Sequence, residues 1–270
     1  MLRSLKDLER YHVRASDGDI GTVVNFLFDD ERWVVRHLVV DVGSFLDGMR
    51  PVLISPISFR SADWATRHFN LALTKEKIRH SPSLDVDKPV SRQHESDYYG
   101  YYRYPYYWGY AGLWGMGMYP GLLAGDAATR APHDTSTKPS GDVHLRSAHA
   151  VRGYHVQGKD KEIGHVEDFI VDDETWAVRY LVIDTTNWWF GKKVLVSPQW
   201  ATKISWSEQM VYVDMSRQAI KDSPEWSADA GVNREYETRL YDYHGRPVYW
   251  DLGVRPSREP AQRELTTHPR

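Results

Sequence analysis

The side chains best suited to binding a metal are His165 and Glu167, which would share one face of a strand because they are two residues apart. The sequence offers no obvious third ligand, so a solvated strand face is the preferred interpretation. Two acidic runs, Asp29–Asp30–Glu31 and Asp172–Asp173–Glu174, could offer oxygen ligands to Ca²⁺ or Mg²⁺. However, three consecutive side chains point in different directions on a turn, and Asp favours turns by bonding to nearby backbone groups. We therefore predict no metal site.

A Ser-His-Asp arrangement can also be written from residues that recur in the two halves of the chain. Its members would be His12 and His155, Asp41 and Asp184, and Ser55 and Ser197. Each serine precedes a proline, without the glycines of a nucleophile elbow. The sequence also lacks a phosphate-binding loop, a dinucleotide fingerprint and a metalloprotease helix. We therefore expect no enzymatic activity, no catalytic residue and no cofactor. Matched polar residues such as Arg36 and Asp41 are interpreted as cross-strand pairs that fix hairpins.

We expect short β-strands to position the candidate residues named above. Val, Ile, Phe and Tyr, which suit a pleated surface, are concentrated in several short segments. These segments are 20–28, 34–41, 52–54, 69–73, 163–171, 177–184 and 193–197. Thr74 is a candidate N-cap for a helical turn that follows the first set. Residues 2–12 could form either a helical turn or a strand edge, and the sequence leaves this open.

The second set of strands repeats the first at a nearly fixed offset, so the chain is interpreted as a tandem duplication. Matched segments include Tyr11-His12-Val13 with Tyr154-His155-Val156, Asp29-Asp30-Glu31 with Asp172-Asp173-Glu174, and Ser55-Pro56 with Ser197-Pro198. Trp33 and Trp176 also match, and both are expected in the core.

A turn with Ile-Gly, an aliphatic strand, Asp-Asp-Glu-x-Trp, x-Val-Arg-x-Leu-Val-x-Asp and then Val-Leu-x-Ser-Pro resembles the PRC-barrel family. That family includes the cytoplasmic domain of the photosynthetic reaction-centre H subunit and a domain of a ribosome maturation factor. The resemblance covers roughly residues 2–82 and 145–226, and it is greatest to bacterial stand-alone PRC-barrel proteins. It implies a mainly β fold of two tandem small antiparallel β-barrels, which is also how small sheets hide their edges.

Composition narrows the class of protein. A chain of 270 residues with 41% hydrophobic and 26% charged residues suits two globular domains. The net charge of −3 is too small to indicate nucleic acid or an anionic membrane surface as a partner, and we expect no nucleic-acid partner. There is no cysteine, and the first ten residues carry charges where a signal peptide would be apolar, so we expect a cytoplasmic protein. The expected division is repeats at 2–82 and 145–226, an aromatic segment with a flexible linker at 83–144, and an aromatic segment with a disordered tail at 227–270.

Aromatic residues outside the strands are the candidate contacts. Trp188 and Trp189 are adjacent on a loop, so at least one should face outward. Tyr104–Gly125 carries no charged side chain, but its Pro, Gly, Tyr and Trp content disfavours a membrane span. Pro105-x-Tyr107-Trp108 recurs as Pro247-x-Tyr249-Trp250, and we expect both segments to dock on a barrel or on a second subunit.

The sequence therefore favours a non-enzymatic binding or scaffolding protein that contacts an unidentified protein. A homodimer is left open, and membrane contact is left open without being favoured. The alternative is a peripheral membrane protein that resembles the reaction-centre H subunit and supports an electron-transfer or photosynthetic assembly. Fold does not settle this choice, because one fold hosts many functions.

Overall fold

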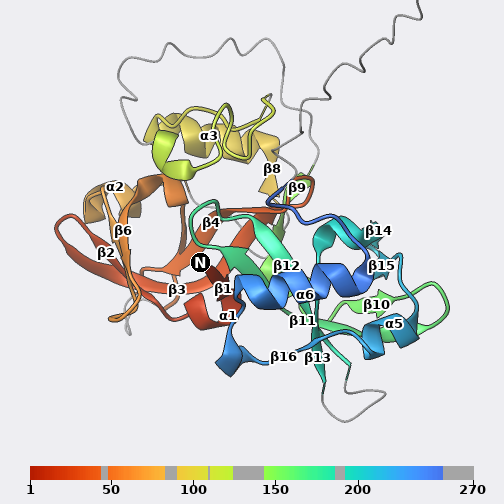
Figure 1. Cartoon of the computed structure of the whole chain (residues 1–270). Helices are drawn as coiled ribbons and strands as arrows, with labels where there is room; N and C mark the ends of the chain where they lie inside the picture. Colours follow the sequence, from red (N-terminus) through yellow and green to blue (C-terminus); the bar gives the residue numbers. More distant parts are fainter. Residues whose placement is uncertain (44–47, 83–89, 109, 124–142, 186–191, 252–270) are drawn as a thin grey trace, which may run out of the picture.

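The computed structural model describes residues 1–43, 48–82, 90–108, 110–123, 143–185 and 192–251 (Figure 1). Strands dominate these residues and form two sheets of eight strands each. No helix in these ranges is both long enough and apolar enough to cross a membrane. The predicted linker at 127–141, the tail from 255 onward and the Trp188–Trp189 pair lie outside the described residues.

The first half contains β1 (Leu2–Ser4), α1 (Leu5–Leu8), β2 (His12–Ala15), β3 (Gly18–Asp29), β4 (Val34–Asp41), β5 (Pro51–Ile54), η1 (Pro56–Ser58), β6 (Phe59–Asp63), β7 (His68–Leu71), α2 (Lys75–Arg79), β8 (Val90–Ser91), α3 (Arg92–Tyr102) and η2 (Pro120–Leu123). The predicted strands are present. Residues 2–8 form a strand followed by a helical turn, and Thr74 caps α2 by accepting the N–H of Lys77 at 3.3 Å.

The second half contains β9 (Val143–Ser147), α4 (Ala148–Val151), β10 (His155–Gln157), β11 (Glu162–Asp172), β12 (Val178–Asp184), β13 (Lys193–Val196), η3 (Pro198–Trp200), β14 (Ala201–Ser205), β15 (Met210–Val213), α5 (Arg217–Lys221), β16 (Glu225–Trp226), η4 (Ala228–Ala230) and α6 (Arg234–His244). Its strand order β13-β12-β11-β10-β15-β14 corresponds strand for strand to β5-β4-β3-β2-β7-β6 in the first sheet. The two halves therefore share one topology, as a duplication predicts.

The backbone repeats in detail as well. Trp33 and Trp176 both adopt left-handed conformations, with φ of 56° and 59°. Gly21 and Gly164 each approach a neighbouring strand so closely that a Cβ would lie 2.0 Å from the carbonyl oxygen of Asp41 or Asp184. No other residue fits such a contact, which explains the Ile-Gly element found twice in the sequence.

The expectation of two closed, antiparallel barrels is not confirmed. Each sheet contains one parallel pair, β2 with β7 and β10 with β15, and in the described residues the end strands β5 and β6 do not pair. The chain passes between β5 and β6 through η1, where Pro56 has no N–H to offer to a ladder. Tyr98 covers the edge of β5, since its hydroxyl accepts the N–H of Ser55 at 3.0 Å and donates to the carbonyl of Leu53 at 3.3 Å. The β5 edge is thus covered although the sheet does not close.

The two halves exchange their first strands. β1 pairs with β11 of the other half, with Leu2 opposite Asp172, and β9 pairs with β3, with Leu145 opposite Asp29. Leu2 matches Leu145 and Asp172 matches Asp29, so each half contributes the same strand to the same place in the other half. An isolated bridge between the matched residues Val34 and Ala177 lies between them. Such reciprocity is the signature of a local twofold axis, so the halves form one interlocked body.

Polar side chains lock both exchanges at matched positions. Buried Asp168 accepts hydrogen bonds from the Ser4 hydroxyl and, at 3.1 Å, from the N–H of Lys6 at the start of α1. In the other direction, Asn25 donates to the Ser147 hydroxyl at 2.8 Å and accepts the N–H of His149 at 3.2 Å. Each repeat therefore caps the short helix of its partner repeat, which satisfies otherwise unpaired N–H groups.

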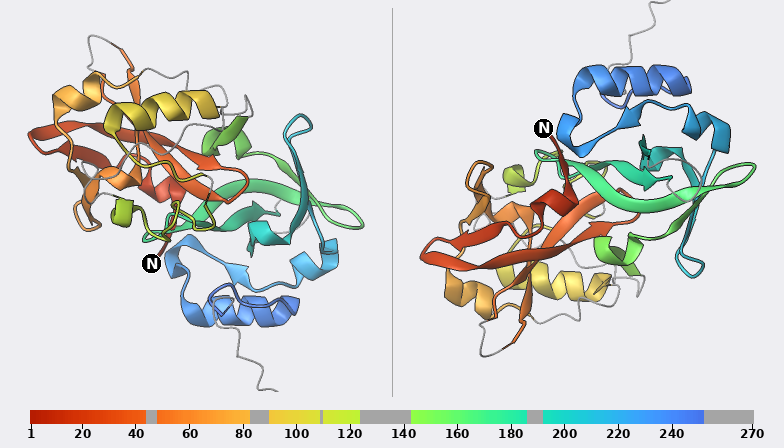
Figure 2. Two further views of the ribbon diagram at one scale, coloured as in Figure 1. Left: turned by 90° about the horizontal axis from the view of Figure 1, so that it is seen from above. Right: turned by 90° about the horizontal axis from the view of Figure 1, so that it is seen from below.

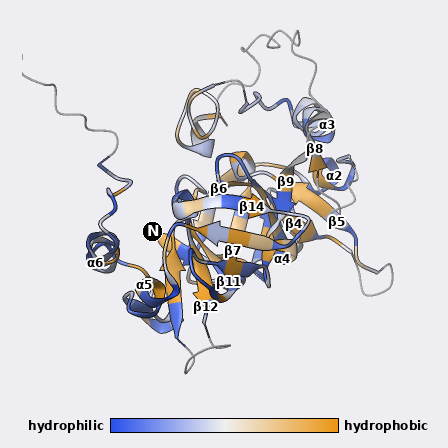
Figure 3. Cartoon of the chain, turned by 90° about the vertical axis from the view of Figure 1, so that its right-hand side faces the viewer, coloured by the Kyte–Doolittle hydropathy of each residue, from blue (hydrophilic) through white to orange (hydrophobic). Residues whose placement is uncertain are grey.

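Two longer helices flank the sheets. Figure 2 shows α3 and α6 at opposite outer sides of the molecule, with the strands between them. In Figure 3 hydrophobic residues concentrate on the strands, whereas α6 is mostly hydrophilic. The helix faces that contact the sheets are nevertheless buried, and they include Tyr98, Tyr99, Leu240 and Tyr241.

We predict that Ser4→Ala lowers the free energy of unfolding by about 1–3 kcal/mol, because buried Asp168 loses a hydrogen-bond donor and α1 loses its N-cap. Chemical denaturation followed by circular dichroism measures this. Ser16→Ala, at an exposed serine of the same half, is the matched control. Equal stability of the two variants would contradict the role given to Ser4.

Candidate functional site

A buried cation joins the first sheet to the aromatic segment. Arg36 on β4 is fully buried, and its Nη2 donates to Asp29 Oδ2 at 2.9 Å. Its Nη1 donates to the carbonyl of Leu113 at 2.5 Å, and its guanidinium lies 3.6 Å from the ring centre of Tyr107. The predicted partner of Arg36 was Asp41, and that prediction is wrong. Asp41 instead accepts backbone N–H groups of Gly43 and Arg50, at 2.9 and 2.8 Å.

Tyr107 extends this network to α3. Its hydroxyl donates to Glu95 Oε1 at 2.5 Å, and both side chains are at most 1% exposed. Burial, reinforced by the charge of Glu95, raises the pKa of Tyr107 well above its ordinary value, so the phenol keeps its proton. Asp29, Arg36, Tyr107 and Glu95 therefore form a continuous chain from the sheet to the helix.

The second half repeats this chain at the matched positions. Arg179 binds Asp172 at 3.2 Å and lies 4.1 Å from the ring centre of Tyr249. The Tyr249 hydroxyl donates to Glu237 on α6 at 2.9 Å. Here Arg179 and Asp172 are partly exposed, so this copy is less buried than the first. We call these two series of contacts the arginine–tyrosine networks: Asp29, Arg36, Tyr107 and Glu95 in the first half, and Asp172, Arg179, Tyr249 and Glu237 in the second.

The arginine–tyrosine networks are suited to holding helices in place. In the buried copy, each charge has an opposite charge or a hydrogen bond within the chain, which is the condition for a charge to be tolerated in a core. The serines of the hypothetical triad also have structural roles. Ser55 and Ser197 are buried, and their side chains accept backbone N–H groups at the starts of η1 and η3.

One position distinguishes the two networks. Tyr180 on β12 donates its hydroxyl to Glu237 at 2.8 Å, whereas the matched residue of the first half is His37. His37 is fully buried, and neither ring nitrogen has a hydrogen-bond partner among the described residues. Its ring packs edge-on against Tyr98 and Tyr99 of α3, with centroids 4.7 and 6.0 Å apart. Burial, with the nearby Arg36 charge, lowers the pKa of His37 from 6.5 to about 3.

The candidate contact aromatics pack within the chain. Tyr107 is 1% exposed, and Trp108, Tyr249 and Trp250 are half-buried. The Tyr107–Trp108 and Tyr249–Trp250 pairs have the same edge-on geometry, with centroids 5.0 and 4.9 Å apart and 85° between the planes. Trp108 packs on Tyr99 of α3 and Trp250 on Tyr241 of α6. Contact of these rings with a partner stays a prediction.

The residues considered for metal binding lie apart or have other roles. Glu167 binds Lys6 at 3.1 Å and Lys193 at 2.8 Å. Asp29 and Asp172 each accept two backbone N–H groups of their own turns, as turn chemistry predicts. In the described ranges no group of three or more His, Asp or Glu side chains is placed to hold a metal ion.

Sequence reasoning missed the helices and their buried glutamates. Glu95, Tyr98, Tyr99 and Tyr102 are all buried and recur with helical spacing, which could have revealed α3. The helical spacing is hard to recognise in the sequence because Tyr and Gly are dense throughout this segment. Glu95 and Glu237 also occupy matched positions in the two halves, a signal that was available in the sequence.

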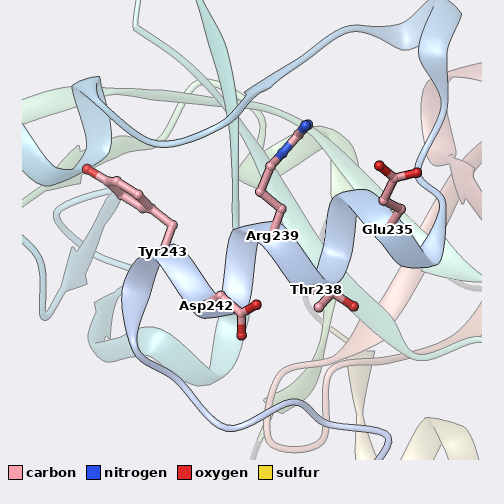
Figure 4. A pocket seen from close by; sticks show the side chains of 5 residues that line it. All are labelled: Glu235, Thr238, Arg239, Asp242 and Tyr243. Atoms are coloured by element: carbon pink, nitrogen blue, oxygen red, sulfur yellow. The ribbon is translucent and has the colours of Figure 1, made fainter.

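The outer face of α6 carries a shallow surface depression. Figure 4 shows Glu235, Thr238, Arg239, Asp242 and Tyr243 projecting from one helix, without converging on a common point. Such a divergent set does not have the convergent polar groups typical of a ligand site.

We predict that His37→Tyr, which installs the residue of the second network, makes the chain more resistant to acid. In the unfolded chain His37 takes up a proton near pH 6.5, but in the fold it stays neutral down to about pH 3. The stability that depends on neutral His37 is therefore complete above 6.5 and declines as the pH falls toward 3.

Between about pH 7.5 and about pH 5 this contribution amounts to roughly 2 kcal/mol, which His37→Tyr should remove from the pH dependence of unfolding. Urea denaturation at both pH values measures the difference. His12→Gln, at an exposed histidine, is the control. An unchanged pH dependence in His37→Tyr would refute the assignment.

Comparison with known proteins finds a family likeness in the second half of the chain. Residues 144–218, from β9 into α5, match the family model of the PRC-barrel domain. A Deinococcus radiodurans protein described as uncharacterized is 32% identical over 95 residues. That match covers 35% of this chain, and the chain spans 33% of the relative's length.

Proposed function

We propose that this chain is a non-enzymatic PRC-barrel protein in which both halves are copies of that domain, and that it works as a protein-binding or scaffolding module. The match of residues 144–218 to the family is the observation that carries the proposal. The shared strand order of the two sheets extends it to the first half. We further propose that the protein acts in the cytoplasm and that its partner is a protein.

The internal use of charged groups supports a binding role over catalysis. Arg36, Asp29, Glu95 and Glu237 are all buried and form contacts that hold α3 and α6 to the sheets. An active site needs a reactive group that a substrate can reach. These groups are enclosed, so a substrate cannot reach them. By fixing α3 and α6 they are better suited to making the outer surface of the molecule rigid.

A peripheral membrane role, resembling that of the reaction-centre H subunit, is the second candidate. The observation in its favour is the exposure of Met116, Met118 and Tyr119, at 80%, 48% and 46%, in a segment without charged side chains. Exposed apolar side chains of this kind can enter a membrane interface or contact a protein.

Affinity purification of the tagged chain from its native cells, with mass spectrometry, tests the leading proposal. We expect a protein partner in near-stoichiometric amount and the tagged chain in the soluble fraction. The variant Met116→Ser/Met118→Ser/Tyr119→Ser tests the exposed patch, and Met49→Ser, at a methionine that is 72% exposed, is its control. Recovery of the chain with membranes, lost in the triple variant alone, would contradict the leading proposal and favour the second.

A further inference from the structure

Because a local twofold axis relates the halves, each junction between them occurs twice. The junction at Trp176 and the junction at Trp33 differ sharply in how well they are filled. Trp176, from the turn between β11 and β12, inserts against the first half. Its ring lies 5.5 Å from that of Phe59 and 6.0 Å from that of Phe69, and only 2% of the residue is exposed. On this side the junction between the halves is filled.

The counterpart junction is open. Trp33 is matched to Trp176, but the positions matched to Phe59 and Phe69 are Ala201 and Val211. Trp33 stacks instead on Phe28 of its own half, with centroids 5.2 Å apart, and stays partly exposed. A shallow, open groove of about 320 Å³ remains, lined by Trp33, Pro198, Ala201, Ile204 and Trp206 together with the polar residues Asp30, Thr202 and Lys203.

The walls of this groove are held in place by the same contacts that hold the filled side. Arg146 binds Asp30 at 2.7 Å and lies 4.3 Å from the ring centre of Trp206. On the filled side, Arg3 binds Asp173 at 2.6 Å and lies 3.6 Å from the ring centre of Trp64. The groove is therefore preformed, and it differs from its counterpart mainly in lacking a ring.

The groove runs along β14, which is an end strand of its sheet in the described residues. An end strand can pair with an added peptide strand, and a pocket beside it then selects a side chain. Lys203 on β14 is exposed and lines the groove, so it places a positive charge beside any added strand.

We propose that this groove binds an extended peptide segment of a partner protein, which pairs along β14 and places an aromatic side chain beside Trp33. The ring takes the position that Phe59 occupies beside Trp176. An acidic residue next to the aromatic one faces Lys203. This proposal rests on the binding function proposed above and identifies the surface through which the chain would bind.

The test uses the purified full-length chain and two blocked peptides, acetyl-Thr-Asp-Phe-Asp-Thr-amide and its analogue with Ala in place of Phe. Binding is followed through the indole N–H signals of Trp33 and Trp206 in NMR spectra, assigned with Trp33→Phe and Trp206→Phe. We expect the Phe peptide to shift both signals saturably and the Ala peptide to bind at least about tenfold more weakly.

Ala201→Phe should fill the groove as Phe59 fills its counterpart, and should weaken binding of the Phe peptide by about tenfold or more. Ala230→Phe, at an exposed alanine of η4, is the control and should leave the affinity unchanged. Lys203→Glu provides a second test, because it should reverse the preference toward a peptide with Lys in place of both Asp residues.

Equal affinity of the unsubstituted and Ala201→Phe chains, or an absence of peptide-induced shifts at Trp33 and Trp206, would overturn the proposal. So would a concentration-dependent mass in light scattering that Ala201→Phe abolishes, because a second copy would then occupy the groove. These measurements use no cellular partner. A negative result here therefore refutes peptide binding at the groove, whereas a negative purification experiment refutes the binding function itself.

Discussion

The rest of this structure depends on the reciprocal exchange of β1 and β9 between the two halves. Each sheet is completed by a strand from the other half, and the Val34–Ala177 bridge joins the halves at their shared axis. Backbone pairing of this kind fixes register as well as contact, because a slip by one residue would turn buried side chains outward. Asp168 and Asn25 then secure the exchanged segments through buried hydrogen bonds. The fixed relation between the halves is what gives the molecule one continuous outer surface.

The arginine–tyrosine networks attach a further layer to this interlocked pair. Each connects a charge on a strand to a glutamate on a flanking helix through a tyrosine. Breaking a buried pair of charges is costly because the remaining charge loses its compensation. The networks therefore specify where α3 and α6 lie more than they add net stability. The two copies have also diverged, since His37 replaces Tyr180 in one and a groove replaces a packed ring beside Trp33. The outer surfaces of the two halves are consequently different, although their strands are alike.

The sequence was sufficient for the strands and for the common topology, because β-branched residues and the Ile-Gly element recur at a constant offset. It could not predict the exchange, since β1 would need the same apolar side chains whether it paired with its own half or with the other. The sequence favours Asp41 as the partner of Arg36 because both residues recur in the two halves, whereas folding brings Arg36 to Asp29. The groove depends on Ala201 lying opposite Trp33, a relation that only the arrangement of the halves reveals. The family resemblance predicts closed barrels, but in the described residues Tyr98 covers the β5 edge and β16 covers the β13 edge instead.

The most direct measurement of the central claim is to replace residues 130–137 with a protease site, cleave the purified chain there, and follow its mass and unfolding. If the halves are interlocked, the cleaved fragments should stay together at the mass of the intact chain. They should also unfold in a single transition that circular dichroism and tryptophan fluorescence report at the same denaturant concentration. Fragments that separate without denaturant, or two distinct transitions, would contradict an interlocked fold and indicate two independent domains.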